Sequence, residues 1–412
     1  MGRWGVVVGC ALLAACGSRT ERSGGAGIVE GASPGGGPGA TDGGGGGGPS
    51  CTPARLVANA GGGSACGVKP VLGSPRTVQV PLQSADGSDG GVPISEECKS
   101  TPPSDGQGLI LARTALAVGA GAPSSGFLSA FDTDGNRVDY AGFGSVGTTG
   151  AEDAFPLGHG WLVEALTGPA TGGAALLPFL PPTGSRPHVF IGDPPFAFAR
   201  APSGGVAAAA AYPTTTGTPC PAGPGGPRFR MFLERFDTEG TLLGPFELGC
   251  VEGPGTELGL GENAAGDVIA LLPDSGWHLA PDGTVTAFPP TTPGTLYPLI
   301  DGQFAKKEGG AWTATIAPDG TVSPPPCWLA SRPDVERFQI VLSGGAYLAV
   351  HGTSCDDYAD LILPDGTSCG PIPISGTDGS CSADAVSVGL DGTLTTLDVR
   401  SCTLSAWPQA FH

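Results

Sequence analysis

The stretch "GWHLAPDGTVTAF" (residues 276–288) contains a short apolar run, the dipeptide Asp-Gly and a second short run. Asp-Gly is typical of a tight β-hairpin, because the turn requires a positive φ that glycine adopts without steric cost. The sequence therefore predicts a hairpin here. Similar stretches, one of them with Glu-Gly at the turn, are LSAFDTDGNRVDY (128–140), LERFDTEGTLLGPFEL (233–248), WTATIAPDGTVSPP (312–325) and YADLILPDGTSCGPI (358–372).

A second kind of hairpin lies beside these stretches, with more continuously apolar strands that indicate burial on both faces. The alanine run at 207–211 belongs to one of them. It lies between Gly205 and Pro213 and is too short to nucleate a helix, so we interpret it as a strand. The clearest examples of this second kind are FAFARAPSGGVAAAAAY (196–212), LGLGENAAGDVIALL (258–272), FQIVLSGGAYLAV (338–350) and VSVGLDGTLTTLDV (386–399).

Two hairpins per unit give four strands, and the units recur about every 37 to 56 residues, which resembles the blade of a β-propeller. The 73 glycines and 42 prolines interrupt the chain too often for long helices. We expect an all-β fold, a β-propeller of seven four-stranded blades. Six blades are an alternative, and a pair of β-sandwich domains is the competing fold. The expected inner hairpins lie near 109–118, 154–165, 196–212, 257–272, 297–315, 337–350 and 384–399.

The last unit lacks a fourth strand, because only TLSAWPQAF (403–411) follows its inner hairpin. A propeller has to close its ring. The segment RTVQVPLQ (76–83) has the alternation of a strand and lies before the first unit. We therefore expect this segment to supply the missing outer strand and to join the first and last parts of the domain.

The N-terminal stretch VVVGCALLAACGSRT (6–20) has an apolar core of about ten residues, too short to span a bilayer about 30 Å thick. Its proportions are those of a signal peptide. Leu13-Ala14-Ala15-Cys16 resembles the lipobox of bacterial lipoproteins, and this resemblance implies cleavage before Cys16 and lipidation of its thiol. The alternative is an ordinary signal peptide in which Cys16 is incidental.

The composition divides the chain into four parts. We expect a signal peptide at 1–15, a lipidated Gly-rich linker at 16–50, a Cys-containing segment at 51–107 and the repeat domain at 108–412. The linker has almost no residue able to build a core, so we expect it to be a flexible tether. The signal and the lipobox together predict a location in the cell envelope. The absence of Asp directly after Cys16 favours the outer membrane, on its periplasmic or surface side.

The formal net charge of −19 argues against a nucleic-acid partner, whose phosphates would be repelled, and against an anionic lipid surface. Of the 12 cysteines, ten remain after Cys10 and Cys16 are set aside. An even number in an exported chain indicates disulfides. The hairpins predict three pairs, and Cys51, Cys66, Cys98 and Cys327 are left to pair among themselves. The three predicted pairs are Cys220 with Cys250, Cys355 with Cys369, and Cys381 with Cys402.

Three short motifs resemble catalytic or metal-binding patterns but lack the required context or spacing. GFGSVG (142–147) fits the dinucleotide pattern, but no helix follows it. GTSCG (366–370) fits a nucleophile elbow, but it follows a β-turn. DTDGN (132–136) departs from the calcium-loop pattern and is interpreted as a hairpin turn. We expect no cofactor and no metal, although the cluster of Asp356, Asp357 and Asp360 offers a weaker cation hypothesis.

Three arginines are the candidate ligand-binding residues, because guanidinium groups bind carboxylates bidentately. Arg113, Arg200 and Arg337 fall in or beside predicted inner strands. The favoured function is a lipid-anchored module that binds an envelope protein or glycan or acts as a scaffold. The alternatives are a glycan hydrolase or lyase at the channel mouth, and a structural envelope protein without a discrete ligand. The acids at comparable positions are Glu152, Asp153, Glu257 and Asp384.

Overall fold

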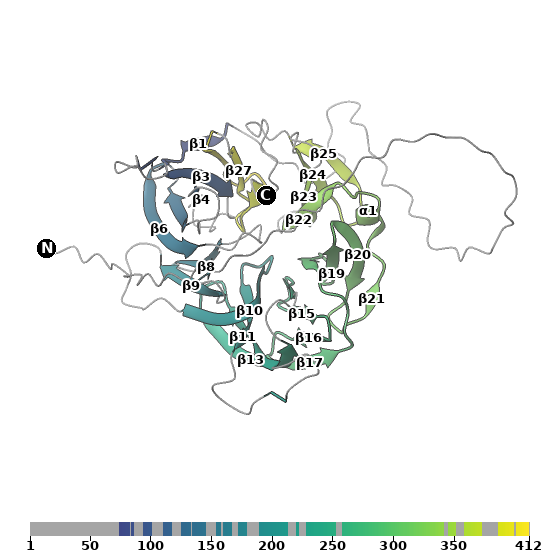
Figure 1. Cartoon of the computed structure of the whole chain (residues 1–412). Helices are drawn as coiled ribbons and strands as arrows, with labels where there is room; N and C mark the ends of the chain where they lie inside the picture. The colour runs from purple at the N-terminus through teal and green to yellow at the C-terminus, as the bar shows by residue number, and fades with distance from the viewer. Residues whose placement is uncertain are drawn as a thin grey trace, which may run out of the picture. The chain divides into compact units, whose positions relative to one another are not determined.

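The structure, a computed structural model, is built almost wholly from antiparallel strands (Figure 1). All of the described residues belong to one compact unit within 51–412. No helix in the described part of the chain is long and apolar enough to span a membrane. The structure describes residues 74–82, 84–85, 94–100, 110–117, 125–132, 134–145, 154–157, 160–166, 172–178, 189–212, 220–221, 228–252, 258–341, 345–351, 358–372, 386–398 and 401–411.

The first three blades come from two sheets of five and seven strands. The seven-stranded sheet contains two blades, because the long strand β10 pairs with β9 through its first residues and with β11 through its last. The strands are β2 (Ser84–Ala85), β3 (Ile94–Ser100), β4 (Ile110–Ala117), β5 (Ser125–Phe131) and β6 (Arg137–Ser145) in blade 1; β7 (Ala154–Leu157), β8 (Gly160–Leu166), β9 (Gly172–Pro178) and the start of β10 (Val189–Arg200) in blade 2; and the end of β10, β11 (Val206–Tyr212), β12 (Arg228–Phe236) and β13 (Leu242–Glu252) in blade 3.

Each of the other four blades is a four-stranded sheet. The short helix α1 (Cys327–Ala330) lies between blades 5 and 6 in the chain. The strands are β14 (Gly259–Glu262), β15 (Val268–Leu272), β16 (Ser275–Leu279) and β17 (Val285–Phe288) in blade 4; β18 (Thr295–Pro298), β19 (Phe304–Glu308), β20 (Ala311–Ile316) and β21 (Val322–Ser323) in blade 5; β22 (Val335–Val341), β23 (Ala346–His351), β24 (Tyr358–Ile362) and β25 (Ser368–Ile372) in blade 6; and β26 (Val386–Val388), β27 (Leu394–Asp398), β28 (Thr403–Trp407) and β1 (Arg76–Gln79) in blade 7.

The blades form a closed ring. Strand β6 contacts β8, and blades 2 and 3 share β10. The first strands of blades 3 to 7 then contact one another in order, from β10 through β14, β18 and β22 to β26. One apolar cluster joins blade 7 to blade 1 through Leu404 and Phe131. The chain is therefore a seven-bladed β-propeller, as the repeats predict.

The ring closes where the sequence predicts. Arg76 pairs with Ala406 and Gln79 with Thr403, so β1 is the outer strand of the last blade. One boundary differs from the expectation. Strand β3 lies in the segment 51–107 but pairs with β4, so blade 1 begins before residue 108 and its inner hairpin does not lie at 109–118.

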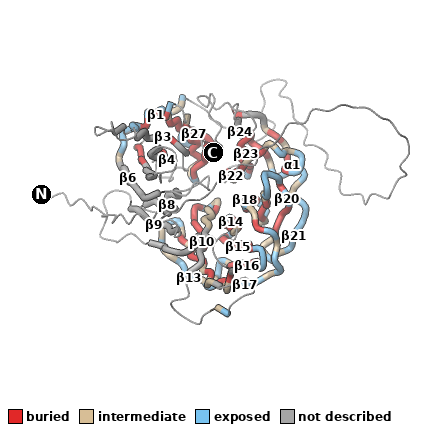
Figure 2. The backbone as a smooth tube through the Cα atoms, in the orientation of Figure 1, coloured by how far each residue is buried: buried red, intermediate tan, exposed pale blue. Residues whose placement is uncertain are grey.

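Apolar side chains between adjacent blades form the core. Figure 2 shows buried residues in red along the strands of the ring. In β15 every residue is buried, as expected for a strand covered on both faces. The alanine run 207–211 lies in strand β11, as interpreted from the sequence, and Ala207 and Ala209 pack in the cluster between blades 3 and 4. Aromatic rings fill the space between blades 5 and 6, where Trp328 stacks on Tyr347 with ring centroids 5.0 Å apart.

Candidate functional site

The two ends of the ring differ in their connections. Blade 1 has an additional strand, β2, beside β3, and its four propeller strands are counted from β3. In each antiparallel blade, the turn after the first strand and the turn after the third strand emerge at the same edge. We call this edge of the ring the turn end. The connections after the second and fourth strands emerge at the opposite edge, which we call the loop end. Both ends are built by the same strands, so differences between them come from the connections.

Five-residue turns of one kind recur at the turn end. In the 280–284 turn, Gly283 donates its N–H to Ala280 O with φ +88°, and Ala280 donates to Thr284 O. The Asp282 carboxylate accepts the N–H of Thr284 at 2.9 Å, and this hydrogen bond lowers the pKa of Asp282. Asp282 and Gly283 are thus the third and fourth residues of a β-turn that begins at Ala280, and Gly283 is its left-handed residue. The same backbone pattern occurs at 132–136, 201–205, 237–241, 263–267, 299–303, 317–321, 363–367 and 389–393.

Two of these turns meet although their blades are not neighbours. Leu390, in the first turn of blade 7, packs against Gly204, in the first turn of blade 3. A Cβ on Gly204 would collide with the Leu390 side chain, and it would also lie 3.3 Å from Thr238 Cγ2. Leu390 keeps 38% of its surface exposed. The turn end is therefore bridged across the ring by a leucine that requires a glycine opposite it.

A buried ion pair joins blades 3 and 4 beside this contact. Arg235 Nε, at the end of β12, donates to Glu262 Oε1 at 2.8 Å, and the Glu262 side chain is 0% exposed. Oε2 of the same carboxylate is buried without a hydrogen-bond partner among the described residues. Burial raises the pKa of Glu262 to about 7, although Arg235 acts in the opposite direction. Sequence analysis did not single out this carboxylate, which lies on the same face of β14 as the buried Leu260.

The next junction, between blades 4 and 5, is polar as well. Asn263 Nδ2 donates to Gly302 O at 2.7 Å, in the first turn of blade 5. Asn263 also donates to Asp267, whose other carboxylate oxygen lies 2.8 Å from His278 Nε2. The 263–267 turn is therefore held between the guanidinium of Arg235 on one side and this network on the other.

The three candidate arginines lie at different places in the ring. Arg113 is in the middle of β4, the second strand of blade 1, and pairs with Leu128. Arg200 is the last residue of β10 and lies at the turn end. Arg337 is the third residue of β22, nearer the loop end, and its buried guanidinium donates to Val386 O of blade 7. Arg337 therefore contributes a hydrogen bond to a blade junction, and ligand binding by the three arginines stays a prediction.

The candidate acids are described in part. Asp360 is buried in β24, where it accepts from Arg332 Nη1 at 2.9 Å and from Ser368 Oγ at 2.7 Å. These contacts give Asp360 a structural role, and they show Ser368 bonded to a carboxylate rather than to a histidine. Among the described residues, no group of histidine, cysteine and acidic side chains is arranged to hold a metal ion. Glu152, Asp153, Glu257, Asp356, Asp357 and Asp384 lie outside the described residues.

The loop end of blades 5 and 6 contains two lysines that sequence analysis missed. Lys306 is buried and donates to Thr292 Oγ1 at 2.6 Å and to Glu308 Oε2 at 3.0 Å. Hydrogen bonds from Lys306 and Thr292 lower the pKa of Glu308. Lys307 donates to Glu336 O at 2.6 Å and lies 5.3 Å from the centre of the Trp312 ring, and burial lowers its pKa. The two lysines are adjacent in β19, and successive side chains of a strand point to opposite faces, so they reach different partners.

An aspartate–histidine pair lies at the same end, where Asp334 Oδ2 is 2.7 Å from His351 Nδ1. An acid and the imidazole that it orients are two of the three members of a hydrolytic triad. The His351 side chain, however, is only 3% exposed, whereas Asp334 is 36% exposed. A substrate at the surface would reach Asp334 but not the His351 ring. We therefore assign the pair a structural role, in which it holds the connection before β22 in place.

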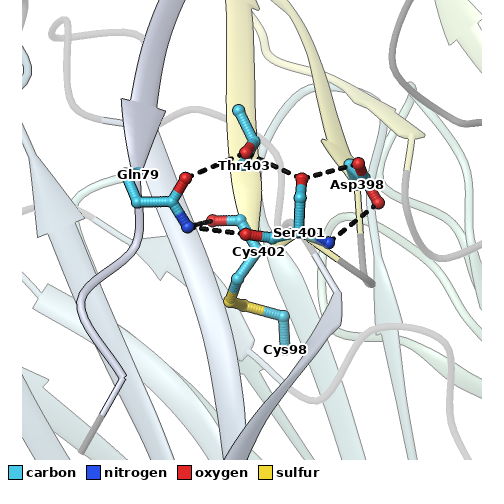
Figure 3. The surroundings of a disulfide bond; sticks show 6 residues. All are labelled: Gln79, Cys98, Asp398, Ser401, Cys402 and Thr403. Atoms are coloured by element: carbon cyan, nitrogen blue, oxygen red, sulfur yellow. Dashed lines mark hydrogen bonds between the residues drawn. A yellow bond between two sulfur atoms is a disulfide. The ribbon is translucent and has the colours of Figure 1, made fainter.

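Two disulfides join described cysteines. Cys220 is bonded to Cys250, as predicted, with a Cα–Cα distance of 5.8 Å. Cys402 is bonded to Cys98, 5.6 Å away between Cα atoms (Figure 3). The predicted pairing of Cys402 with Cys381 and the grouping of Cys98 with Cys51, Cys66 and Cys327 are therefore wrong, because ring closure brings β3 beside the connection before β28. Cys327 and Cys369 each form a disulfide as well. Cys355, Cys381 and Cys16 lie outside the described residues, so the pairing of Cys355 with Cys369 stays a prediction.

Polar contacts surround the Cys98–Cys402 bond (Figure 3). Gln79 Nε2 donates to Ser401 O at 2.6 Å and to Cys402 O at 3.3 Å, and Thr403 Oγ1 donates to Gln79 Oε1. Gln79 belongs to β1, so a side chain of the closing strand binds the backbone at Ser401 and Cys402, next to the disulfide. The seam between blades 7 and 1 is thus closed by a strand pairing, a covalent bond and a side-chain clamp.

Comparison with known proteins gives only distant likenesses. No family model and no curated protein matches the chain. Among solved structures, Pyrococcus horikoshii acylaminoacyl peptidase is 11% identical with a TM-score of 0.39, over 66% of this chain and 45% of the peptidase. A streptogramin B lyase is 13% identical with a TM-score of 0.34, over 79% and 96% of the two chains. TolB from Acinetobacter baumannii is 12% identical with a TM-score of 0.29, over 69% and 76%. This chain is similar to all three only at the level of strand arrangement, and spans less than half the length of the peptidase.

Proposed function

We propose that this protein is a lipid-anchored binding or scaffolding module of the cell envelope, and that it binds an envelope protein or glycan at the loop end of its propeller. The lipobox at Leu13-Ala14-Ala15-Cys16 supports the anchor. The anchor places the propeller outside the cytoplasm, where its disulfides are stable. The proposal requires no reaction at the site, only a surface of fixed shape.

The difference between the two ends carries this assignment. The turn end repeats one short turn and is bridged by Leu390 and Gly204. The loop end contains connections that vary in length, from Gly309 and Gly310 after β19 to the segment with α1 before β22. Binding residues in scaffolds concentrate on variable loops held by a rigid framework. The loop end is therefore the better candidate for a ligand surface.

Two glycines provide a matched test. Gly309 at the loop end and Gly345 at the turn end both have φ +56°, and a Cβ at either position would meet nothing within 4 Å. The strain of a substitution is thus the same at both sites. Gly309→Arg projects a long side chain over the loop end, and Gly345→Arg does the same at the turn end.

The experiment screens the full chain against peptidoglycan fragments, surface oligosaccharides and envelope peptides by calorimetry. A ligand found with the unmodified protein is then titrated into both variants. We expect Gly309→Arg to weaken binding at least tenfold and Gly345→Arg to leave it unchanged. Equal weakening by both variants, loss in Gly345→Arg alone, or no binder at millimolar concentration would overturn the proposal.

A further inference from the structure

The junction of blades 3 and 4 contains an ionisable group in an unusual position. The Glu262 carboxylate is fully buried, with one oxygen bound to Arg235 Nε and the other without a partner among the described residues. A buried carboxylate normally has its oxygens satisfied by several donors. The ionised form of Glu262 therefore has less solvation here than it would have in water.

Glu262 is in contact with the turn that bridges the ring. Its Oε1 lies 3.5 Å from the position of a Cβ on Gly205, and the preceding residue, Gly204, packs against Leu390 of blade 7. On the opposite side, the Arg235 guanidinium lies against Gly266 in the 263–267 turn. A movement that brings water to Glu262 has to displace the 201–205 turn, the 263–267 turn or both.

Few other charges in the described part of the chain face this carboxylate. Arg235 is the charged group that contacts Glu262, and the 201–205 turn has no ionisable side chain. Arg200 precedes that turn at the end of β10. Beyond the 263–267 turn lie Asp267 and His278, which bind each other, and His278 contributes to lowering the pKa of Asp282 and Asp319. Protonation of Glu262 therefore leaves Arg235 as the main unbalanced charge of the junction.

We propose that Glu262 is a proton-operated latch of the turn end, which keeps the 201–205 and 263–267 turns closed when it is neutral and favours their opening when it is ionised. In this role the protein senses the acidity of its surroundings. Acid holds the contact between Gly204 and Leu390, and neutral to alkaline conditions loosen it. The latch acts on the end opposite the proposed ligand surface and does not depend on that surface.

The size of the effect follows from linkage. The pKa of Glu262 is about 7 in the closed junction, against an ordinary value of 4.5 when hydrated. Such a difference changes the equilibrium between closed and opened turns by up to about 300-fold as the pH rises from about 4.5 to above 7. Below that interval both states bind the proton, and above it both have lost it.

Backbone hydrogen exchange of the full chain tests the latch. The Gly204 N–H is bonded to Ala201 O and the Gly266 N–H to Asn263 O, so both exchange only when their turns open. The Gly283 N–H, bonded to Ala280 O in the same blade, is the matched internal control. After correction for the intrinsic rate, we expect protection of Gly204 and Gly266 to fall steeply with rising pH and that of Gly283 to stay level.

The variant Glu262→Gln keeps the shape of the side chain and removes its proton equilibrium. We expect the fall of protection with pH at Gly204 and Gly266 to disappear in this variant. Protection that does not change with pH in the unmodified protein would overturn the proposal by itself, so the test remains valid even if Glu262→Gln fails to fold. The proposal would also be overturned if protection fell equally steeply with pH in Glu262→Gln, or if it fell as steeply at Gly283 as at Gly204 and Gly266.

Discussion

Cys98 and Cys402 are bonded to each other across 304 residues of chain, with their Cα atoms 5.6 Å apart. The bond fixes the first strand of blade 1 to the last blade, next to the β1–β28 pairing. A disulfide that closes a longer loop removes more entropy from the unfolded chain. The seam disulfide is thus expected to stabilise the ring more than one within a single blade.

The matched comparison is with Cys220–Cys250, which closes only 30 residues. The loop-closure relation gives about 6 kcal/mol for the longer bond and about 4 kcal/mol for the shorter one, as upper values. We expect the double variant Cys98→Ser/Cys402→Ser to lose more unfolding free energy than Cys220→Ser/Cys250→Ser. Urea unfolding of both variants measures the difference. Equal losses of unfolding free energy would mean that loop-closure entropy does not determine how much the Cys98–Cys402 bond stabilises the protein.

The turn glycines differ in what surrounds them. Gly310 and Gly320 both have φ +84°, but a Cβ meets nothing at Gly310 and would lie 2.5 Å from Phe288 Cγ at Gly320. The backbone strain of an alanine is about 1–2 kcal/mol at either site, and crowding of Phe288 adds about 1–3 kcal/mol at Gly320. We expect Gly320→Ala to lower the melting temperature clearly more than Gly310→Ala. The reverse order would show that Phe288 moves aside freely.

The pH dependence of global stability has a defined sign at Glu262. Because the folded pKa of about 7 is above the ordinary 4.5, the folded protein holds a proton that the unfolded chain has released between these values. The free energy of unfolding therefore falls as the pH rises through this interval, by up to about 3 kcal/mol from this group. Denaturant midpoints at pH 5 and pH 7.5 measure the fall, and Glu262→Gln is expected to reduce it. If the free energy of unfolding fell equally in Glu262→Gln, the fall would come from other titrating groups.

The anchor prediction concerns Cys16, which precedes the Gly-rich linker. Acylation of this thiol buries hydrocarbon chains in the bilayer, each methylene contributing about 0.8 kcal/mol. We expect Cys16→Ala to move the protein from the membrane fraction to the soluble fraction. The intact mass of the unmodified protein is expected to fit a chain that begins at Cys16 with acyl groups attached. A variant that stays in the membrane fraction would contradict lipid anchoring.

Local patterns in the sequence were sufficient to predict the blades. Alternation and Asp-Gly turns act within a few residues, so strands such as β16 and β17 and the turn between them could be recognised directly. The closing strand could be predicted as well, because the last unit lacked a partner and Arg76 begins a suitable segment. The first strand of blade 1 was missed because ISEECKS (94–100) is polar and has little of the expected apolar character.

Contacts between distant blades were outside the reach of these patterns. The pairing of Cys402 with Cys98 depends on where the ring closes, and local spacing favoured Cys381 instead. The contact of Leu390 with Gly204 depends on two turns meeting from non-adjacent blades. Arg337 was singled out by its charge, but its bond to Val386 O depends on the approach of two first strands. Glu262 had one local signal, an acid on the apolar face of β14.

The position of β1 has a consequence for the order in which the protein is completed during synthesis. A chain is made from its N-terminus, so β1 emerges early and its partner strand much later; Gln79 and Thr403 are 324 residues apart. Until β28 arrives, the edge of β1 has unpaired backbone groups that other chains can join. A factor that shields this edge would lower the risk of aggregation during this interval. Arrest of synthesis shortly before residue 403 is therefore expected to leave a species far more prone to aggregation and proteolysis than its length suggests.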